Sequence, residues 1–305
     1  MVRRAGGSGA LHLIPSSIRL PITIQPQPDE SSCGPTCLHA IYQFWGDQQT
    51  LGTVVDRTGR LEHGGTLAVF LACDALRRGF KATIFTYNLT VFDPSWFAAS
   101  EASRVESDID GVPGLPSAQL ESDRVLPAPA GAMPVSAPLD IAERLRQQQA
   151  VKMDYRLQHA TTGYLEFLER GGCLRLFDLS ENLIREILSR GTPILTGLSS
   201  TFLYRSAREY GPDDIPDDVM GSPSGHFVVI AGYDRPQRRV LVMDPYASHP
   251  YGKTLEYWIS IDRIIGAVLL GIVTHDANLL VIEPSPESLQ RASANTQPIK
   301  PRRTP

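Results

Sequence analysis

The segment of residues 27–38, QPDESSCGPTCL, constrains the fold of this chain more than any other part of its sequence. An aspartate and two serines that can cap a helix precede Cys33, and Pro35 is favoured in a first helical turn. We therefore expect Cys33 to begin a helix, where the helix dipole favours a negatively charged thiolate. Gly34 lets another backbone or a substrate come close to that thiol.

The other cysteines carry no comparable signal. The chain has four cysteines in 305 residues, too few for a disulfide scaffold, and no Cys-x2-Cys pair of the kind that indicates a zinc site. We expect a reducing, cytoplasmic environment, no metal and no organic cofactor. Cys37 lies on the apolar face of the predicted helix, one turn after Cys33, and is expected to be a core residue.

The order of the predicted elements indicates an α+β chain. Apolar residues at helical spacing predict helices over 33–45 and 66–79, and a third helix over 181–190 follows Ser180, its expected cap. Apolar and β-branched runs predict strands, which cover 81–87, 192–198, 226–234, 238–244, 267–273 and 278–284. Helices that precede most of the strands favour an N-terminal helical lobe and a C-terminal antiparallel β lobe.

Composition and charge suggest the domain limits and argue against some functions. Residues 1–20 and 286–305 are rich in proline, serine, arginine and glycine, and are predicted to be disordered tails. The stretch at about 99–138 has many prolines and no apolar period, which predicts a loop insertion within one domain over 21–285. A net charge of -4 argues against nucleic-acid binding. No apolar run is long enough for a membrane span, and no signal peptide is expected.

A thiol nucleophile needs an imidazole base, and the imidazole needs a third group that fixes its orientation. His226 begins one strand of a predicted hairpin, and Asp244 ends the other. If the turn is centred on Arg235, the two residues lie directly opposite each other on one face, about 5 Å apart at their Cβ atoms. The alternative is a surface histidine and an aspartate that only ends a strand before Pro245.

Gln27 lies six residues before Cys33 and carries an uncharged N–H donor. Together with the backbone N–H of Cys33, it can form an oxyanion hole for acyl transfer. The alternative is that Gln27 is an ordinary loop residue and Cys33 a buried cysteine at the start of a helix.

The pattern Gln-x-Asp-x-Ser-x-Cys-Gly-Pro-x-Cys-Leu resembles that of the bacteriocin-processing cysteine peptidases, cysteine peptidase family thirty-nine, which cut double-glycine leader peptides. The later segments GHFVVIAGYD and VLVMDPY are similar to the His and Asp segments of that family. The resemblance covers roughly residues 22–90 and 180–285. It implies a papain-like cysteine proteinase fold, in a stand-alone relative without the membrane and ATPase domains of the transporter-linked members.

The resemblance also implies a set of functional residues. Matched one by one, Cys33 is the nucleophile, His226 the base, Asp244 its orienting group and Gln27 the oxyanion donor. The expected function is a cysteine-dependent hydrolase that cleaves a peptide or amide bond in a peptide or protein substrate. An acyltransferase on the same fold and a catalytically inactive peptide-binding module remain as alternatives. The acidic loop at 209–218 is expected to be a solvated lid that favours basic peptide residues.

Overall fold

The computed structural model describes residues 15–59, 65–97, 140–274 and 276–295 of this chain. The insertion predicted at about 99–138 lies outside the described residues, as do parts of both predicted tails. Within the described part, no helix has the length and the apolar character needed to cross a membrane.

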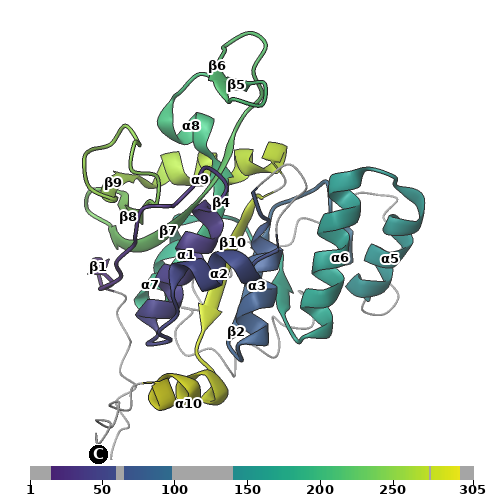
Figure 1. Cartoon of the computed structure of the whole chain (residues 1–305), viewed down its shortest axis with the longest axis horizontal. Coiled ribbons are helices and arrows are strands. Elements are labelled where there is room, and N and C mark those ends of the chain that lie inside the picture. Colours follow the sequence, from purple (N-terminus) through teal and green to yellow (C-terminus); the bar gives the residue numbers. More distant parts are fainter. Residues whose placement is uncertain (1–14, 60–64, 98–139, 275, 296–305) are drawn as a thin grey trace, which may run out of the picture.

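A sheet of eight strands forms the centre of the molecule (Figure 1). Its strand order is β3-β2-β10-β4-β7-β8-β9, with β1 also paired to β7, and every pair is antiparallel except β2 with β3. The strands are β1 (Ser17–Arg19), β2 (Lys81–Thr86), β3 (Cys173–Arg175), β4 (Ile194–Ser199), β7 (Gly225–Asp234), β8 (Arg239–Met243), β9 (Glu256–Ser260) and β10 (Asn278–Glu283). Because β2 pairs with β10, the sheet joins the two halves of the chain.

Helices cover both faces of this sheet, so its central strands are buried on both sides. Along β7, Phe227 and Val229 pack with residues of α1, α3 and α6, whereas Val228 and Ile230 pack with residues of α7 and α9. The helices are α1 (Cys33–Phe44), α2 (Leu51–Arg57), α3 (Ala68–Arg77), α5 (Ile141–Val151), α6 (Tyr155–Glu169), α7 (Glu181–Ser189), α8 (Ser200–Tyr204), α9 (Ile261–Leu270) and α10 (Pro286–Asn295), with short 3-10 turns η1 (Pro94–Trp96) and η2 (Gly271–Thr274).

The predicted α+β class is confirmed, with helices in the N-terminal part and a mostly antiparallel sheet toward the C-terminus. Helices α1, α3 and α7 and strands β2, β4, β7, β8 and β10 all occur where the sequence predicts them. Ser180 caps α7 as expected, because its hydroxyl accepts a hydrogen bond of 3.2 Å from the backbone N–H of Leu183. Local sequence signals therefore determine most of these elements.

The strand predicted over 267–273 is wrong, because this run completes α9 and continues as η2. Ile264, Ala267 and Val268 are fully buried at helical spacing. The apolar run is therefore the inner face of a helix that covers the sheet. A short apolar run does not distinguish a buried strand from a buried helix by its period alone.

The ordered chain extends into both predicted tails. Strand β1 adds to β7, with Ser17 opposite Asp234. Helix α10 follows Ser285, whose hydroxyl donates to the carbonyl of Gly79 at the end of α3. The composition of both segments favours disorder. Strand pairing orders the first of them, and a side-chain contact orders the second.

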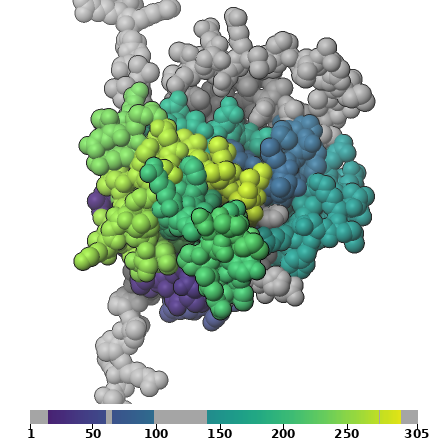
Figure 2. Space-filling model, turned by 90° about the horizontal axis from the view of Figure 1, so that it is seen from above, coloured from purple at the N-terminus to yellow at the C-terminus, as the bar shows by residue number. Residues whose placement is uncertain are grey.

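The acidic loop at 209–218 forms a small two-stranded hairpin, β5 (Glu209–Tyr210) with β6 (Ile215–Pro216), on the chain between α8 and β7. This green segment lies at the surface nearest the viewer when the molecule is seen from above (Figure 2). Val219 and Met220 beside it are well exposed apolar residues. The role of this segment as a lid remains a prediction.

Gly34 lets the start of α1 lie close against its neighbours. A Cβ atom at this position would be 2.6 Å from Cγ2 of Thr66 and 3.2 Å from the ring of Phe227, the residue after His226. Since carbon atoms do not approach to 2.6 Å without displacement, any side chain here would push α1 away from β7.

We expect Gly34→Ala to lower the free energy of unfolding by about 1–3 kcal/mol, the usual cost of overpacking a core. Gly52→Ala in α2 is the matched control, because nothing lies within 4 Å of the Cβ atom it adds. Alanine is also the better helix former, so the control is expected to be neutral or slightly stabilising. Urea unfolding of both variants measures the difference. A Gly34→Ala protein as stable as the wild type would contradict the close packing.

Candidate active site

Cys33 is the first residue of α1, as predicted, and its exposed fraction is 8%. The turn before it is shaped by Asp29, whose Oδ1 accepts hydrogen bonds from the backbone N–H (2.9 Å) and the hydroxyl (2.8 Å) of Ser31. The Ser32 hydroxyl also donates to that carboxylate and caps no N–H group of α1. The side chain of Ser32 therefore leaves the N–H groups in the first turn of α1 uncapped.

His226 is the second residue of β7, and its Nε2 lies 2.8 Å from Oδ1 of Asp244. The predicted hydrogen-bonding distance between the two side chains is confirmed. Both are buried, with exposed fractions of 8% for His226 and 0% for Asp244. Since Nε2 is engaged by the carboxylate, Nδ1 is the ring nitrogen that remains for the thiol of Cys33.

The register predicted for this pair is wrong. The turn is centred later than Arg235, because Asp234 pairs with Arg239, and the register shift further along β7 offsets this by only one residue. The ladder between β7 and β8 ends before it reaches His226, so His226 and Asp244 are not directly opposed in a strand pair. Their side chains meet just beyond the end of β8.

Four hydrogen bonds hold the carboxylate of Asp244. Its Oδ1 accepts from Nε2 of His226 (2.8 Å) and from the backbone N–H of Tyr246 (3.0 Å). Its Oδ2 accepts from the hydroxyls of Tyr204 and Tyr257, at 2.8 Å each. The two tyrosines are absent from the sequence prediction, because nothing local to α8 or β9 marks them as partners of a residue at the end of β8. Their hydroxyls fix the carboxylate that orients the imidazole.

The surroundings of His226 favour its protonated form. Burial alone lowers the pKa of the imidazole, but the charge and hydrogen bond of Asp244, together with the Cys33 thiol, raise that pKa above its usual value. Burial raises the pKa of Asp244, and the charge of His226 with its hydrogen bonds overcomes this and lowers it. The Cys33 thiol and the Asp244 carboxylate therefore both raise the pKa of one imidazole, and Asp244 is within hydrogen-bonding distance of it.

Gln27 lies beside the segment that carries Asp244, but its side chain bonds elsewhere. Its backbone N–H donates to the carbonyl of Pro245 (2.9 Å), which places it next to the segment that carries Asp244. Its amide Nε2 donates to the carbonyl of Asp29 (3.0 Å), within the turn that precedes Cys33. The amide group carries two N–H bonds, so one remains for a further acceptor.

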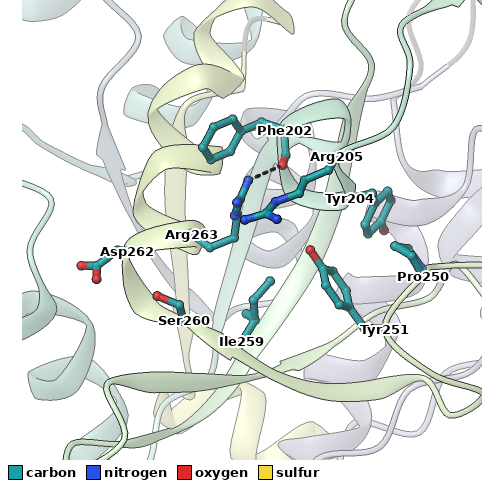
Figure 3. A pocket seen from close by; sticks show the side chains of 9 residues that line it. All are labelled: Phe202, Tyr204, Arg205, Pro250, Tyr251, Ile259, Ser260, Asp262 and Arg263. Carbon is teal, nitrogen blue, oxygen red and sulfur yellow. Dashed lines mark hydrogen bonds between the residues drawn. The ribbon is translucent and has the colours of Figure 1, made fainter.

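Aromatic rings enclose the imidazole on its outer side. The ring centroids of Tyr204 and Tyr246 lie 6.0 Å and 6.2 Å from that of His226. Tyr204 also lies 6.2 Å from Tyr251, and both line a pocket next to the site (Figure 3). Rings that exclude water lower the local dielectric constant and strengthen the attraction between the imidazolium and the carboxylate.

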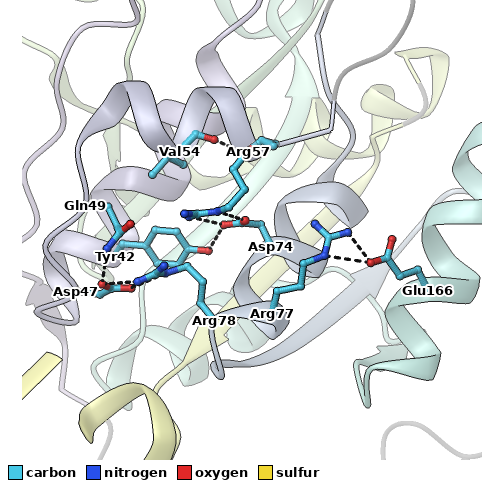
Figure 4. A network of polar contacts seen from close by, with 10 residues as sticks. Tyr42, Asp47, Gln49, Val54, Arg57, Asp74, Arg77, Arg78 and Glu166 are labelled. Atoms are coloured by element: carbon cyan, nitrogen blue, oxygen red, sulfur yellow. Dashed lines mark hydrogen bonds and ion pairs between the residues drawn. The ribbon is translucent and has the colours of Figure 1, made fainter. Parts of the chain in front are cut away.

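A second buried carboxylate, Asp74 of α3, lies toward the other end of α1 (Figure 4). It accepts a hydrogen bond of 2.6 Å from the Tyr42 hydroxyl and pairs with the guanidinium of Arg57. Nearby, Arg78 pairs with Asp47. These bonds join α1, α2 and α3, so the cluster stabilises the helical part of the molecule.

Two further thiols, Cys37 and Cys73, are structural. Cys37 is fully buried, as predicted, and its Sγ donates to the carbonyl of Phe227 at 3.3 Å. Burial raises the pKa of Cys37, and it raises that of Cys73 to about 12. Neither thiol is ionised at neutral pH, so Cys33 is distinguished from both by its surroundings.

The position of His39 on the polar side of α1 predicts a solvated side chain, but this side of the helix is covered. His39 is only 4% exposed and bonds through Nε2 to the carbonyl of Gln49 (3.0 Å) in the loop before α2. His249 bonds in the same way to the carbonyl of Thr254 (2.9 Å). In the part of the chain that the structure describes, no group of three or more His, Cys, Asp or Glu side chains could hold a metal ion.

Residues 143–263 match a family described as the Peptidase_C39 like family. The matched region contains His226 and Asp244, whereas Gln27 and Cys33 precede it. This match confirms the family resemblance inferred from the sequence.

Two solved structures are similar to the chain at low identity. A C39-like peptidase from Bacillus anthracis has 18% identity and a TM-score of 0.22, and the match covers 35% of this chain and 48% of that one. Xylellain, a cysteine protease from Xylella fastidiosa, has 12% identity and a TM-score of 0.37, and the match covers 92% of this chain and 91% of that one. The chain thus spans about half the length of the first of these structures. No curated protein matches it.

The electrostatic coupling between His226 and Asp244 can be measured directly. We expect Asp244→Asn to lower the pKa of the His226 imidazole, because the negative charge that raises it is removed while burial, which lowers it, remains. Titration of the imidazole signals by NMR measures the change. Tyr257→Phe is the control: it removes one hydrogen bond to Asp244 and keeps the charge, so the pKa is expected to move much less.

The same shifts fix the pH range in which the pair stabilises the fold. A raised His226 pKa contributes stability that is complete below the ordinary value of 6.5 and is lost as pH rises through the folded-state pKa. A lowered Asp244 pKa contributes stability that is complete above the ordinary value of 3.8 and is lost as pH falls through its folded-state pKa. Asp244→Asn is therefore expected to destabilise the protein most between these two ordinary values, and an effect independent of pH would contradict the pairing.

Proposed function

We propose that this chain, which carries a region of the Peptidase_C39-like family, is a cysteine-dependent hydrolase that cleaves a peptide or amide bond. Cys33 is the nucleophile, His226 the acid and base, and Asp244 the group that orients the imidazole. Gln27 and the backbone N–H of Cys33 are the oxyanion donors. The observation that carries the proposal is the position of one buried imidazole between the Cys33 thiol and the Asp244 carboxylate.

The proposed reaction follows from these contacts. The Cys33 thiolate attacks the carbonyl carbon, a C–S bond forms, and the carbonyl electron pair moves to oxygen, where the two N–H donors stabilise it. When this intermediate collapses, the C–N bond breaks and the leaving amine takes a proton from His226. Water then gives a proton to His226 and attacks the thioester, which releases the acid and restores the thiolate and imidazolium.

The raised pKa of His226 supports this sequence of steps, because the imidazole must carry a proton when the amine leaves. The four hydrogen bonds to Asp244 keep the ring from rotating between steps. A peptide-binding module without activity has no need of a buried charge pair beside a thiol, so the contacts favour catalysis over that alternative.

An acyltransferase shares the first half of this reaction and differs in the molecule that attacks the thioester. Product analysis with and without added amines separates the two. Hydrolysis predicts a free acid in both cases, whereas acyl transfer predicts an amide product whose yield rises with the amine concentration.

The reactivity of Cys33 is a first test. We expect limiting alkylation with iodoacetamide at neutral pH to label Cys33 before the other thiols, because of its position at a helix start beside His226. Mass spectrometry of the digested protein identifies the labelled residue. Cys173 is the internal control, since it is more exposed than Cys33 and lacks these neighbours. Label that enters Cys173 first would contradict the proposal.

The role of Gln27 is a second test. We expect Gln27→Ala to keep the fold and to lower kcat by about 10²–10³-fold, the usual loss for one oxyanion donor. Turnover of a peptide substrate found in a cleavage library measures the loss. Gln147→Ala, at an exposed position of α5, is the control and is expected to be fully active. Unchanged turnover in Gln27→Ala would remove this residue from the site while leaving the assignment of Cys33 intact.

A further inference from the structure

A pocket of about 600 Å³ lies beside the candidate active site, between α8, the start of α9, the end of β9 and the loop that carries Tyr251 (Figure 3). Its size is that of a site for a small molecule or for one or two amino-acid residues. Much of its lining is apolar or aromatic, including Phe202, Tyr251 and Ile259. Nothing in the proposed hydrolysis so far uses this pocket.

Two guanidinium groups face the pocket. Arg263 donates a hydrogen bond of 3.0 Å to the carbonyl of Phe202 and lies 4.6 Å above the ring of that residue. Arg205 approaches from the end of α8 (Figure 3). Both guanidiniums point to the side of the pocket where the hydroxyl of Tyr251 lies (Figure 3). Burial raises the pKa of that hydroxyl, and the charges of Arg263 and Arg205 oppose this rise.

No acidic partner offsets these charges. Of the residues that the structure describes, none places a carboxylate within ion-pair distance of Arg205 or Arg263. Asp262, at the rim of the pocket, pairs with Arg238 at 3.0 Å and points away from the two guanidiniums (Figure 3). The pocket thus presents two positive charges that no carboxylate of the described residues pairs with.

Each arginine occupies a helix position with one unfavourable feature. Arg205 is the C-cap of α8 in the left-handed conformation, with φ 56°, where glycine or asparagine is the usual residue, although a cation suits this end of a helix. Arg263 lies in the first turn of α9, where the helix dipole disfavours a cation, and it donates to the carbonyl of Phe202 in α8.

The pocket adjoins the pair of His226 and Asp244. Tyr204 lines the pocket, its ring lies 6.0 Å from His226, and its hydroxyl binds Asp244. A part of the substrate bound in the pocket would therefore lie one aromatic ring away from this pair.

We propose that this pocket binds a carboxylate of the substrate, next to an apolar or aromatic side chain. Planar guanidinium groups match a carboxylate in shape and charge, and the apolar lining takes the side chain beside it. This inference rests on the proposed function for the identification of the bound molecule as a peptide substrate. The carboxylate has two sources, the C-terminus of a peptide or an acidic side chain, and the test below separates them.

Binding to the full chain with Cys33→Ala tests the proposal without turnover. Three probes are compared by calorimetry: acetyl-Ala-Ala-Phe as the free acid, the same peptide as its C-terminal amide, and acetyl-Ala-Glu-Phe amide. We expect the free acid to bind at least about ten-fold more tightly than its amide, the usual effect of a charge-assisted bond. Tight binding of the glutamate peptide would identify the side chain as a source. Equal affinity for all three probes would overturn the proposal.

Substitution of the arginines identifies the site of binding. Arg205→Asn keeps a residue that tolerates the left-handed conformation and removes the charge. Arg263→Gln keeps a donor for the carbonyl of Phe202, in case the first variant fails to fold. Either variant is expected to abolish the preference for the free acid, whereas Arg156→Gln, at an exposed position of α6, keeps it. A preference that survives both pocket substitutions would overturn the proposal.

The measurement also separates this inference from the proposed hydrolysis. A wild-type chain that cleaves a library peptide but whose Cys33→Ala variant shows no preference for carboxylates retains the hydrolase proposal and loses the pocket proposal. A chain that binds the free acid through Arg205 but cleaves nothing retains the pocket as a carboxylate site and loses the hydrolase proposal.

Discussion

The contact between the first turn of α1 and the start of β7 is the constraint on which the rest of the site depends. Gly34 lies against the Phe227 ring, and the Cys37 thiol donates to the Phe227 carbonyl at 3.3 Å. Cys33 precedes Gly34 and His226 precedes Phe227, so the same contact that packs the core sets the thiol beside the imidazole. Core packing and site geometry therefore depend on the same contact between α1 and β7. A change that moves α1 also moves the Cys33 thiol relative to the His226 imidazole.

The charge pair behind this contact imposes the second constraint. A carboxylate that is 0% exposed is strongly unfavourable unless its charge and its lone pairs are satisfied. Asp244 meets this requirement with one imidazolium, one backbone N–H and two tyrosine hydroxyls, which come from four different elements of the chain. The arrangement holds the ring of His226 in one orientation. The carboxylate also favours the protonated imidazole, which supplies the proton that the proposed reaction needs.

Sequence reasoning succeeds where a short segment determines its own structure. The start of α1 at Cys33, the Ser180 cap and the strands on either side of the turn after Asp234 all follow from local signals. It fails where distant contacts decide. The turn after Asp234 is centred later than predicted, so His226 and Asp244 are not directly opposed, and the tyrosines that hold Asp244 come from segments with no local sign of that role. The candidate triad was predictable, whereas the groups that fix its orientation were not.

Tyr204 connects the pair of His226 and Asp244 with the pocket that Arg205 and Arg263 line. Its hydroxyl binds Oδ2 of Asp244 while its ring forms part of the pocket, so any ligand that orders α8 also orders one of the donors to that carboxylate. Tyr257 binds the same oxygen from β9, and its ring lies 4.6 Å from that of Tyr251, which also lines the pocket. Both tyrosine donors of the carboxylate are therefore next to the pocket. A carboxylate bound by Arg205 and Arg263 would act on the orientation of His226 through these two hydrogen bonds.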